Sequence, residues 1–329
     1  MDNSFFILSK QSVSVSRFHI CTWDIENSNS FIEIGMEFAP TTSHELEFKF
    51  VAPFAQSGNE VKCLAENLNK DSNNSKFIFN DNIKNFQVIK GDKRNGAILT
   101  FENRNDLAIL PLERLSLSSQ IISFKIKLPD PNLECPCYIR FLIRVKKKTL
   151  STIKKGITNT SFIYDIKLNE KRNLPNEVHN LIKDEYRLCK VENCFCFHVI
   201  PNNLNISFVD QNKLKNIREL EVKAFKNYLP EELEKMKEDR YIIVFNKASK
   251  EESYSFFTIF TKEIIGTNQI LLAIGTNILC SLLFAIAGLR LNFKSGVSIW
   301  KQIPIEYWLA FIVLILLALF LFRPNKKMK

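Results

Sequence analysis

The sequence predicts a mainly β protein, built as an antiparallel β-sandwich followed by a small α+β subdomain and a C-terminal two-helix transmembrane hairpin. Three observations support this fold class. Apolar and polar residues alternate in many short runs up to about residue 168, as they do in half-buried strands. Helical patterns enter only after that point, and two long apolar runs lie near the end of the chain. We therefore expect three parts, residues 1–170, 171–262 and 263–329.

The alternation is clearest in residues 137–145, where apolar side chains share one face and arginines share the other. The apolar face holds Cys137, Ile139, Phe141, Ile143 and Val145, and the opposite face holds Arg140 and Arg144. Further strands are expected over residues 13–23, 32–38, 46–50, 76–79, 86–89, 97–101, 122–128 and 162–168. Asn95-Gly96, between two of these runs, is a hairpin signal. Many short strands with turn residues between them favour an Ig-like or jelly-roll-like sandwich.

The following segment mixes helical and strand patterns. Residues 174–186 look helical, with Pro175 near the first position. Residues 193–200 and 204–209 predict a strand pair, and residues 241–245 and 253–260 are also of β type. Residues 213–229 fit a helix or a strand, and residues 231–239 predict a short acidic helix. This part, residues 171–262, is expected to couple the sandwich to the C-terminal helices.

The two apolar runs cover residues 270–289 and 307–322. A bilayer core of about 30 Å needs about 20 apolar residues in helical form, and neither run has the polar face of a soluble helix. We expect a hairpin that crosses the membrane twice; a buried helical pair in a soluble protein is the alternative.

In the first run, small and polar residues recur at near four-residue spacing. They are Ala273, Asn277, Ser281, Ala285 and Gly288. In lipid, such a stripe is where helices approach closely and hydrogen-bond, so the first helix is expected to face protein and to support self-association. For Asn277 two interpretations stay open: a hydrogen bond within one hairpin, or a pore or oligomer seam.

The formal net charge is +10, from 45 Lys and Arg against 35 Asp and Glu. This surplus suits an anionic partner, either nucleic acid or anionic lipid. Four tail cations, Arg323, Lys326, Lys327 and Lys329, are expected at the lipid surface. The positive-inside bias and the lack of a basic leader before residues 4–8 predict a cell inner membrane protein with both termini cytoplasmic.

Eight cysteines in such a location are expected to be thiols. Strand periodicity places some of them, with one histidine, on shared faces, as a candidate zinc-ligand set: Cys135, Cys137, Cys194, Cys196 and His198. The C-x-C spacing differs from the usual C-x-x-C, and buried free cysteines are the commoner explanation of such a pattern. We expect no cofactor.

Catalytic signatures are absent from the sequence. Gly91 to Gly96 has the first spacing of a phosphate loop, but Ala97 follows where Lys is required. The chain has no G-x-S-x-G, H-E-x-x-H or G-x-G-x-x-G motif, so we expect a protein that is not an enzyme.

A β-rich domain joined through a small subdomain to a helical hairpin with a polar stripe resembles the two-helix transmembrane effectors of bacterial antiphage defence systems, in particular the retron-associated type. The resemblance covers the architecture of the whole chain. It implies a toxic effector of abortive infection, held inactive by a reverse transcriptase and its RNA–DNA product and then released to perturb the inner membrane. Two other classes remain open: a non-toxic membrane-anchored adaptor that binds a protein partner, and a metal enzyme that uses the Cys/His group.

Overall fold

The computed structural model describes residues 4–25, 30–41, 43–52, 55, 59–79, 81–91, 95–118, 120–128, 134–145, 147–156, 158–234, 236, 240–264 and 267–290, with eight further positions between 302 and 315. The chain divides into two compact units, Met1–Lys262 and Glu263–Lys329.

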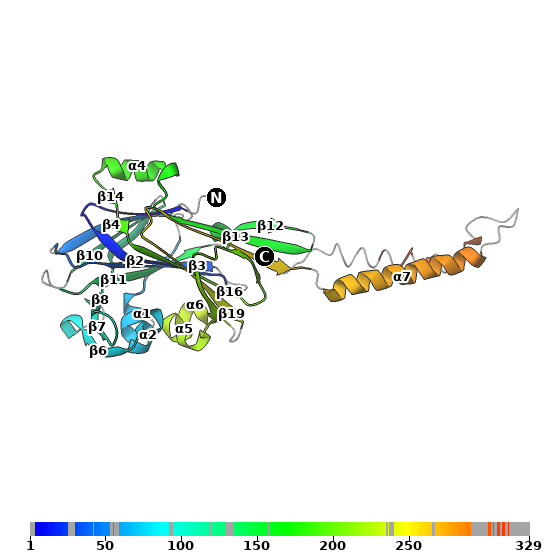
Figure 1. The fold of residues 1–329 in the computed structure, drawn as a ribbon, viewed down its shortest axis with the longest axis horizontal. Helices are drawn as coiled ribbons and strands as arrows, with labels where there is room; N and C mark the ends of the chain where they lie inside the picture. The colour runs from blue at the N-terminus through cyan, green and yellow to red at the C-terminus, as the bar shows by residue number, and fades with distance from the viewer. Residues whose placement is uncertain are drawn as a thin grey trace. The chain divides into compact units, whose positions relative to one another are not determined.

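The first unit contains two β-sheets that pack face to face (Figure 1). The first sheet has the order β17 (Asn205–Val209), β20 (Tyr254–Glu263), β13 (Asn159–Leu168), β1 (Ser4–Ser9), β4 (Glu45–Val51), β10 (Ile121–Lys127), β9 (Glu113–Ser118), with β12 (Thr152–Lys155) on β13 and β14 (Arg187–Leu188) on β1. The mainly β class is confirmed.

The second sheet has the order β18 (Leu214–Glu219), β19 (Tyr241–Ser249), β16 (Asn193–Pro201), β2 (Ser14–Trp23), β3 (Ser30–Phe38), β11 (Cys137–Val145), β8 (Leu107–Ile109), β7 (Ala97–Phe101), β6 (Ile83–Val88), with β15 (Lys190–Val191) on β2 and β5 (Val61–Cys63) on β11. Most pairs are antiparallel, but β1–β13, β2–β16, β2–β15 and β8–β11 are parallel. The segment 171–262 contributes strands to both sheets.

The space between the sheets is filled largely by aromatic and branched side chains. Phe50 of the first sheet lies 6.4 Å from Phe18 and 5.7 Å from Phe141 of the second, measured between ring centroids. The alternation read in residues 137–145 is confirmed, because its apolar face lies in this core while Arg140 points to the opposite side of the sheet. A two-residue period placed one face of each strand inward, and burial of that face stabilises the sandwich.

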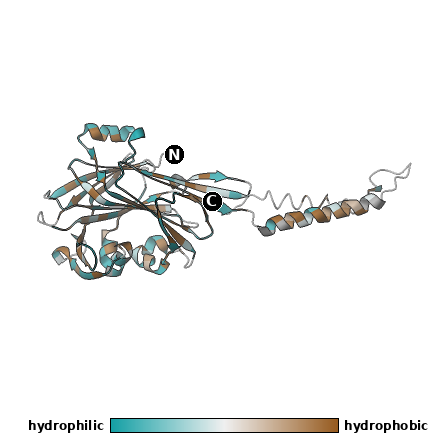
Figure 2. Cartoon of the chain, in the orientation of Figure 1, coloured by the Kyte–Doolittle hydropathy of each residue, from teal (hydrophilic) through white to brown (hydrophobic). Residues whose placement is uncertain are grey.

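Helices cover the outer faces of both sheets (Figures 1 and 2). On the first sheet, α4 (Asn176–Lys183) packs Val178 and Leu181 over β1 and β4. On the second, the cover consists of α1 (Ala65–Lys70), α2 (Ser72–Phe79), α5 (Val222–Tyr228) and α6 (Pro230–Leu233). Shorter helical turns are η1 (Ile89–Gly91), α3 (Lys147–Leu150) and η3 (Lys171–Asn173).

Among the local differences between prediction and structure, three are informative. The strand predicted at residues 76–79 is the end of α2. Residues 213–229 divide into β18 and α5, so each alternative was right for half of the segment. Strand β1 was missed because its residues are buried on both faces, in the sandwich core and beneath α4, and such a strand shows no alternation.

The predicted transmembrane hairpin and inner-membrane localisation are corrected here. Within the described ranges, no helix of the structure is long and apolar enough to cross a membrane. The first apolar run forms α7 (Thr267–Arg290), whose middle holds the polar residues Thr276, Asn277 and Ser281. The membrane prediction relied on the length of the run, although each of these polar groups lowers the free energy gained when the helix is buried in hydrocarbon. Most of the second run lies outside the described residues.

Candidate functional site

A cavity of about 290 Å³ opens on the outer face of the second sheet, beside the helical cover. Its floor is formed by β2, β16, β19 and β18, and α2 and the segment after β7 contribute to its wall. We call this cavity the arginine pocket; its lining residues are Arg17, His19, Ile78, Phe79, Arg104, Phe195, Phe197, Asn216, Arg218, Ile243 and Phe245.

Three separate parts of the chain supply the guanidinium groups. Arg17 projects from β2, Arg104 from the connection between β7 and β8, and Arg218 from the edge strand β18. Arg104 stacks on Phe79 and Phe101, its guanidinium carbon 5.2 and 4.8 Å from the two ring centroids. The rings hold one face of this guanidinium, so its donors are oriented before any ligand arrives.

Glu37 of β3 provides the carboxylate that the structure shows between two of the arginines. Its Oε2 accepts from Arg104 Nη2 at 2.8 Å and lies 3.8 Å from Arg17 Nε. Its Oε1 accepts from the Ser16 hydroxyl at 3.1 Å. Asp81 is a second carboxylate whose charge acts on Arg104, and Arg218 forms no ion pair within the described part of the chain. Three guanidinium groups against two carboxylates leave the pocket with a positive surplus.

Aromatic rings line the floor as a ladder. Phe197 and Phe245 face each other across β16 and β19, with ring centroids 4.6 Å apart and planes at 9°. Phe195 lies 6.1 Å from Phe245 at 14°. All three rings are only half-buried, so the ladder leaves apolar surface at the cavity.

His19 joins the pocket to a buried polar network. Its Nδ1 lies 3.1 Å from the Tyr138 hydroxyl, which also accepts from Arg140 Nη1 at 3.0 Å. Burial, and then the charges of Arg140, Arg17 and Arg104, hold the pKa of His19 well below its ordinary value, so the ring is neutral at pH 7. Whichever ring nitrogen carries the proton, Nδ1 is engaged by Tyr138.

Gly35 makes this network sterically feasible. A Cβ at this position would lie 2.2 Å from the Tyr138 hydroxyl oxygen and 3.3 Å from the His19 Cβ. Strand β3 therefore carries a glycine where the Tyr138 side chain of the neighbouring strand β11 crosses it.

Beyond Tyr138 the network ends in a buried ion pair. The Glu33 carboxylate, with no exposed surface, accepts from Arg140 Nε at 2.6 Å, from Trp23 Nε1 at 2.5 Å and from the Tyr228 hydroxyl at 2.9 Å. Burial is the largest single influence and opposes the charge on Arg140, but Glu33 together with Tyr138, Tyr228 and Cys21 keeps the pKa of that guanidinium well above its ordinary value. The pocket wall is thus tied through β3 and β11 to α5.

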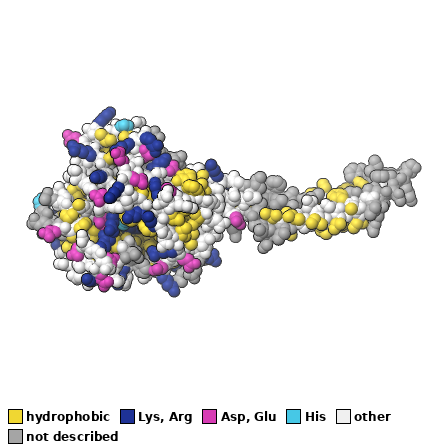
Figure 3. Space-filling model, in the orientation of Figure 1, with side chains coloured by type: hydrophobic (Ala, Val, Ile, Leu, Met, Phe, Trp, Pro, Cys, Tyr) yellow, Lys and Arg dark blue, Asp and Glu magenta, His cyan; other side chains and the backbone are white. Residues whose placement is uncertain are grey.

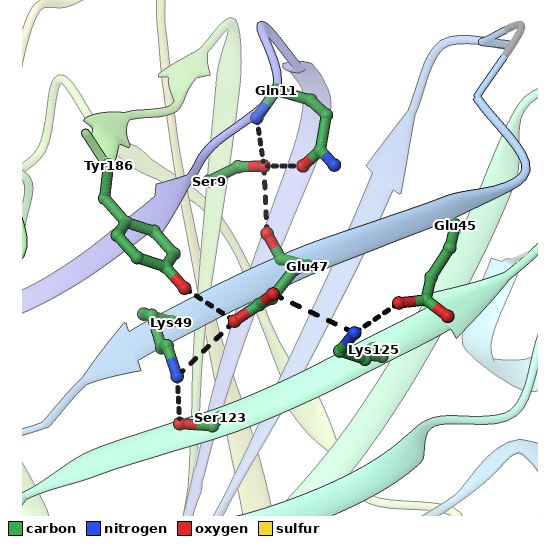
Figure 4. Close-up of polar contacts among 8 residues, drawn as sticks. All are labelled: Ser9, Gln11, Glu45, Glu47, Lys49, Ser123, Lys125 and Tyr186. Atoms are coloured by element: carbon green, nitrogen blue, oxygen red, sulfur yellow. Dashed lines mark hydrogen bonds and ion pairs between the residues drawn. The ribbon is translucent and has the colours of Figure 1, made fainter. Parts of the chain in front are cut away.

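Acidic and basic side chains are mixed on the face of the sandwich that Figure 3 shows. On the outer face of the first sheet, Glu47 accepts from Tyr186 at 2.5 Å and pairs with Lys49 and Lys125, and Lys125 also contacts Glu45 (Figure 4). A larger hollow of about 790 Å³ near β15 is lined by three lysines and three glutamates, Lys171, Lys190, Lys250, Glu192, Glu251 and Glu252. Neither place has the cationic surplus of the arginine pocket.

The predicted zinc ligands lie in two separate places. Cys194, Cys196 and His198 share the inner face of β16, and His198 Nδ1 contacts the Thr22 hydroxyl at 2.8 Å. Cys137 is on β11, which is separated from β16 by β2 and β3, and Cys135 precedes it. Strands are about 4.8 Å apart, so the two groups are too distant to share an ion. No cluster of three or more metal-binding side chains occurs among the residues described, and all eight cysteines are free.

The predicted polar stripe lies on α7, where its members are exposed: Ala273, Asn277, Ser281, Ala285 and Gly288. The Ser281 hydroxyl donates to the Asn277 carbonyl oxygen at 2.9 Å, inside the same helix. The tail cations Arg323, Lys326, Lys327 and Lys329 lie outside the described residues.

Sequence reasoning missed the arginine pocket because its arginines are far apart in the chain and none belongs to a basic run. The sequence did hold one sign of the pocket: Phe195, Phe197 and Phe245 are large rings at strand positions on the face opposite to the core. Exposed aromatic residues on a sheet face are a sign of a binding surface.

Comparison with known proteins yields little. No protein-family model and no curated protein matches the chain. The chain is similar to the crystal structure of an M1 zinc metallopeptidase from Deinococcus radiodurans at 7% identity and a TM-score of 0.29, over 78% of this chain and 43% of the other. So low a score supports no conclusion about fold or function.

Proposed function

We propose that this chain is a binding protein without catalytic activity, whose sandwich holds an anionic partner in the arginine pocket. The observation that carries the proposal is the convergence of three arginines on one hollow with Glu37 as the carboxylate between two of them. A guanidinium presents paired N–H donors that fit phosphate and carboxylate oxygens.

The chemistry of the pocket favours binding over catalysis. His19 is neutral, its Nδ1 is engaged by Tyr138, and its lowered pKa makes it a weak base. Arginine does not lose its proton at physiological pH, so the guanidinium groups bind charge and do not act as bases. This proposal keeps the binding role of the adaptor alternative. The antiphage effector depended on the membrane hairpin, and with that feature corrected we do not carry it further.

The proposal is tested by thermal unfolding of the full chain with tripolyphosphate, a compact polyanion that has no aromatic ring. We expect a rise in Tm that shrinks as salt increases, because charge interactions at a partly exposed pocket are screened. The variant R17A/R218A should lose this rise. The matched control K154A/K155A removes the same charge from exposed positions of β12 and should keep it. Equal behaviour of the two variants would contradict the proposal.

A further inference from the structure

The arginine pocket combines two features that a simple anion site does not need. Its floor is a ladder of three nearly parallel phenylalanine rings, and its rim carries guanidinium groups on both sides of that ladder, from β2 and β18. An inorganic anion would use the rim and leave the rings in water. A planar ring that carries a phosphate would use both.

The ladder is built so that another ring can extend it. Phe195, Phe245 and Phe197 keep their planes within 14° and 9° in successive contacts. The sheet pairs Phe197 with Phe245, and it pairs Phe195 with Lys247, whose Nζ lies 5.4 Å from the centroid of the Phe195 ring. They remain half-buried although ordinary packing would cover them. Nucleic acid bases stack on such rings whatever their sequence, since each base has a π-face.

Asn216 adds a group that can recognise the edge of a base. It lies opposite Phe245 on the neighbouring strand β18 and lines the same pocket. Its amide supplies both a donor and an acceptor, which is the combination that the polar edge of a base requires. The amide would add nothing to recognition of a bare phosphate beyond what the arginines provide.

Resting on the proposed binding function, we propose that the arginine pocket holds one unpaired nucleotide, its base stacked on the Phe195–Phe245–Phe197 ladder and its phosphate bound at the rim, by Arg17 on the β2 side or by Arg218 on the β18 side. Two sources share this chemistry: a free mononucleotide and an unpaired position of a single-stranded nucleic acid. A base in a duplex is excluded, because both of its faces are already stacked.

The test compares five probes on the full chain: AMP, phenyl phosphate, tripolyphosphate, a short 5′-labelled oligothymidylate, and a duplex that contains the same strand. Anisotropy follows the labelled strands and calorimetry follows the small molecules. We expect the single strand to bind more tightly than the duplex, and AMP more tightly than phenyl phosphate. Tight binding of AMP alone identifies a free nucleotide as the source, and tight binding of the oligonucleotide identifies a single strand.

Two variants separate this inference from the proposed function. F245L removes the central ring of the ladder and should weaken oligonucleotide or AMP binding about 5- to 150-fold, the range measured for loss of base stacking. Its binding of tripolyphosphate, which needs no ring, should fall far less than its binding of AMP, and far-UV circular dichroism shows whether the variant is folded. R17A/R218A should weaken binding of every probe.

Distinct results would overturn each statement. If phenyl phosphate binds as well as AMP, or if F245L leaves AMP and oligonucleotide affinity unchanged while tripolyphosphate still binds, the nucleotide assignment is wrong and the anion site survives. If no probe binds to the wild-type chain, or R17A/R218A has no effect on any of them, the proposed function fails as well.

Discussion

Replacement of Glu33 by glutamine should strongly destabilise the sandwich, although the two side chains have nearly the same shape. Glu33 is fully buried and receives hydrogen bonds from Trp23, Arg140 and Tyr228. E33Q removes the negative charge and leaves the Arg140 guanidinium buried with no compensating carboxylate. Breaking a buried ion pair in this way costs about 3–5 kcal/mol.

The loss should be visible against the total stability, which for folded domains is about 5–15 kcal/mol. We would measure it by urea unfolding followed by far-UV circular dichroism, because the sheets dominate that signal. Trp23 fluorescence offers a second probe, since the indole stacks on Phe31 at 5.3 Å and donates to Glu33.

A double-mutant cycle with R140Q isolates the charge interaction from the loss of hydrogen bonds. If the cost of E33Q comes from an uncompensated charge, the double variant E33Q/R140Q should be less destabilised than the sum of the single variants. E252Q, at an exposed pair with Lys171, serves as the surface control and should show almost no change. Additive effects in the cycle, or an E33Q loss no larger than that of the surface control, would refute the reasoning.

Three further predictions follow from other buried groups. Burial lowers the pKa of His198 to about 3, so as pH falls the unfolded chain takes up a proton on this residue before the folded chain does. The free energy of unfolding should therefore decrease as pH drops below about 6.5, by about 3 kcal/mol at pH 4.5. The variant H198N should flatten this pH dependence in urea unfolding. G35A should cost about 1–3 kcal/mol in unfolding free energy and weaken pocket binding, because its Cβ collides with the Tyr138 hydroxyl oxygen; full stability would contradict this account. The hydrogen bond from Tyr186 lowers the pKa of Glu47. The bond therefore contributes stability above the ordinary pKa of a glutamate, and this stability is lost as pH falls through the lowered pKa. Y186F should reduce the acid-dependent loss of stability, and an unchanged pH profile would show that the bond contributes nothing.

The comparison of sequence and structure is instructive at particular elements. The strand pattern of residues 137–145 was readable because one face of β11 meets the core and the other meets charged groups. β1 was not readable, because α4 covers the face that would otherwise be polar. The α2 segment was assigned to a strand on four residues, too few to distinguish a period of two from one of 3.6.

The C-terminal segment shows a different error. Its long apolar runs predicted a transmembrane hairpin, and the predicted orientation, localisation and antiphage role all depended on that hairpin. No helix within the described ranges meets the length and hydropathy that a membrane crossing needs. The hairpin and the localisation are thereby corrected, whereas the antiphage role stays an untested prediction that has lost its structural support.

By itself the sequence determined the mainly β class, the faces of most core strands and the absence of catalytic motifs, because these depend on patterns between near neighbours. The tertiary structure alone decided which strands lie side by side, and so brought Arg17, Arg104 and Arg218 around three phenylalanine rings and separated Cys137 from Cys194. The physical reason is that strand order in a sheet is set by packing of the whole core, through contacts between residues far apart in the chain. A site assembled from such residues leaves no local pattern in the sequence.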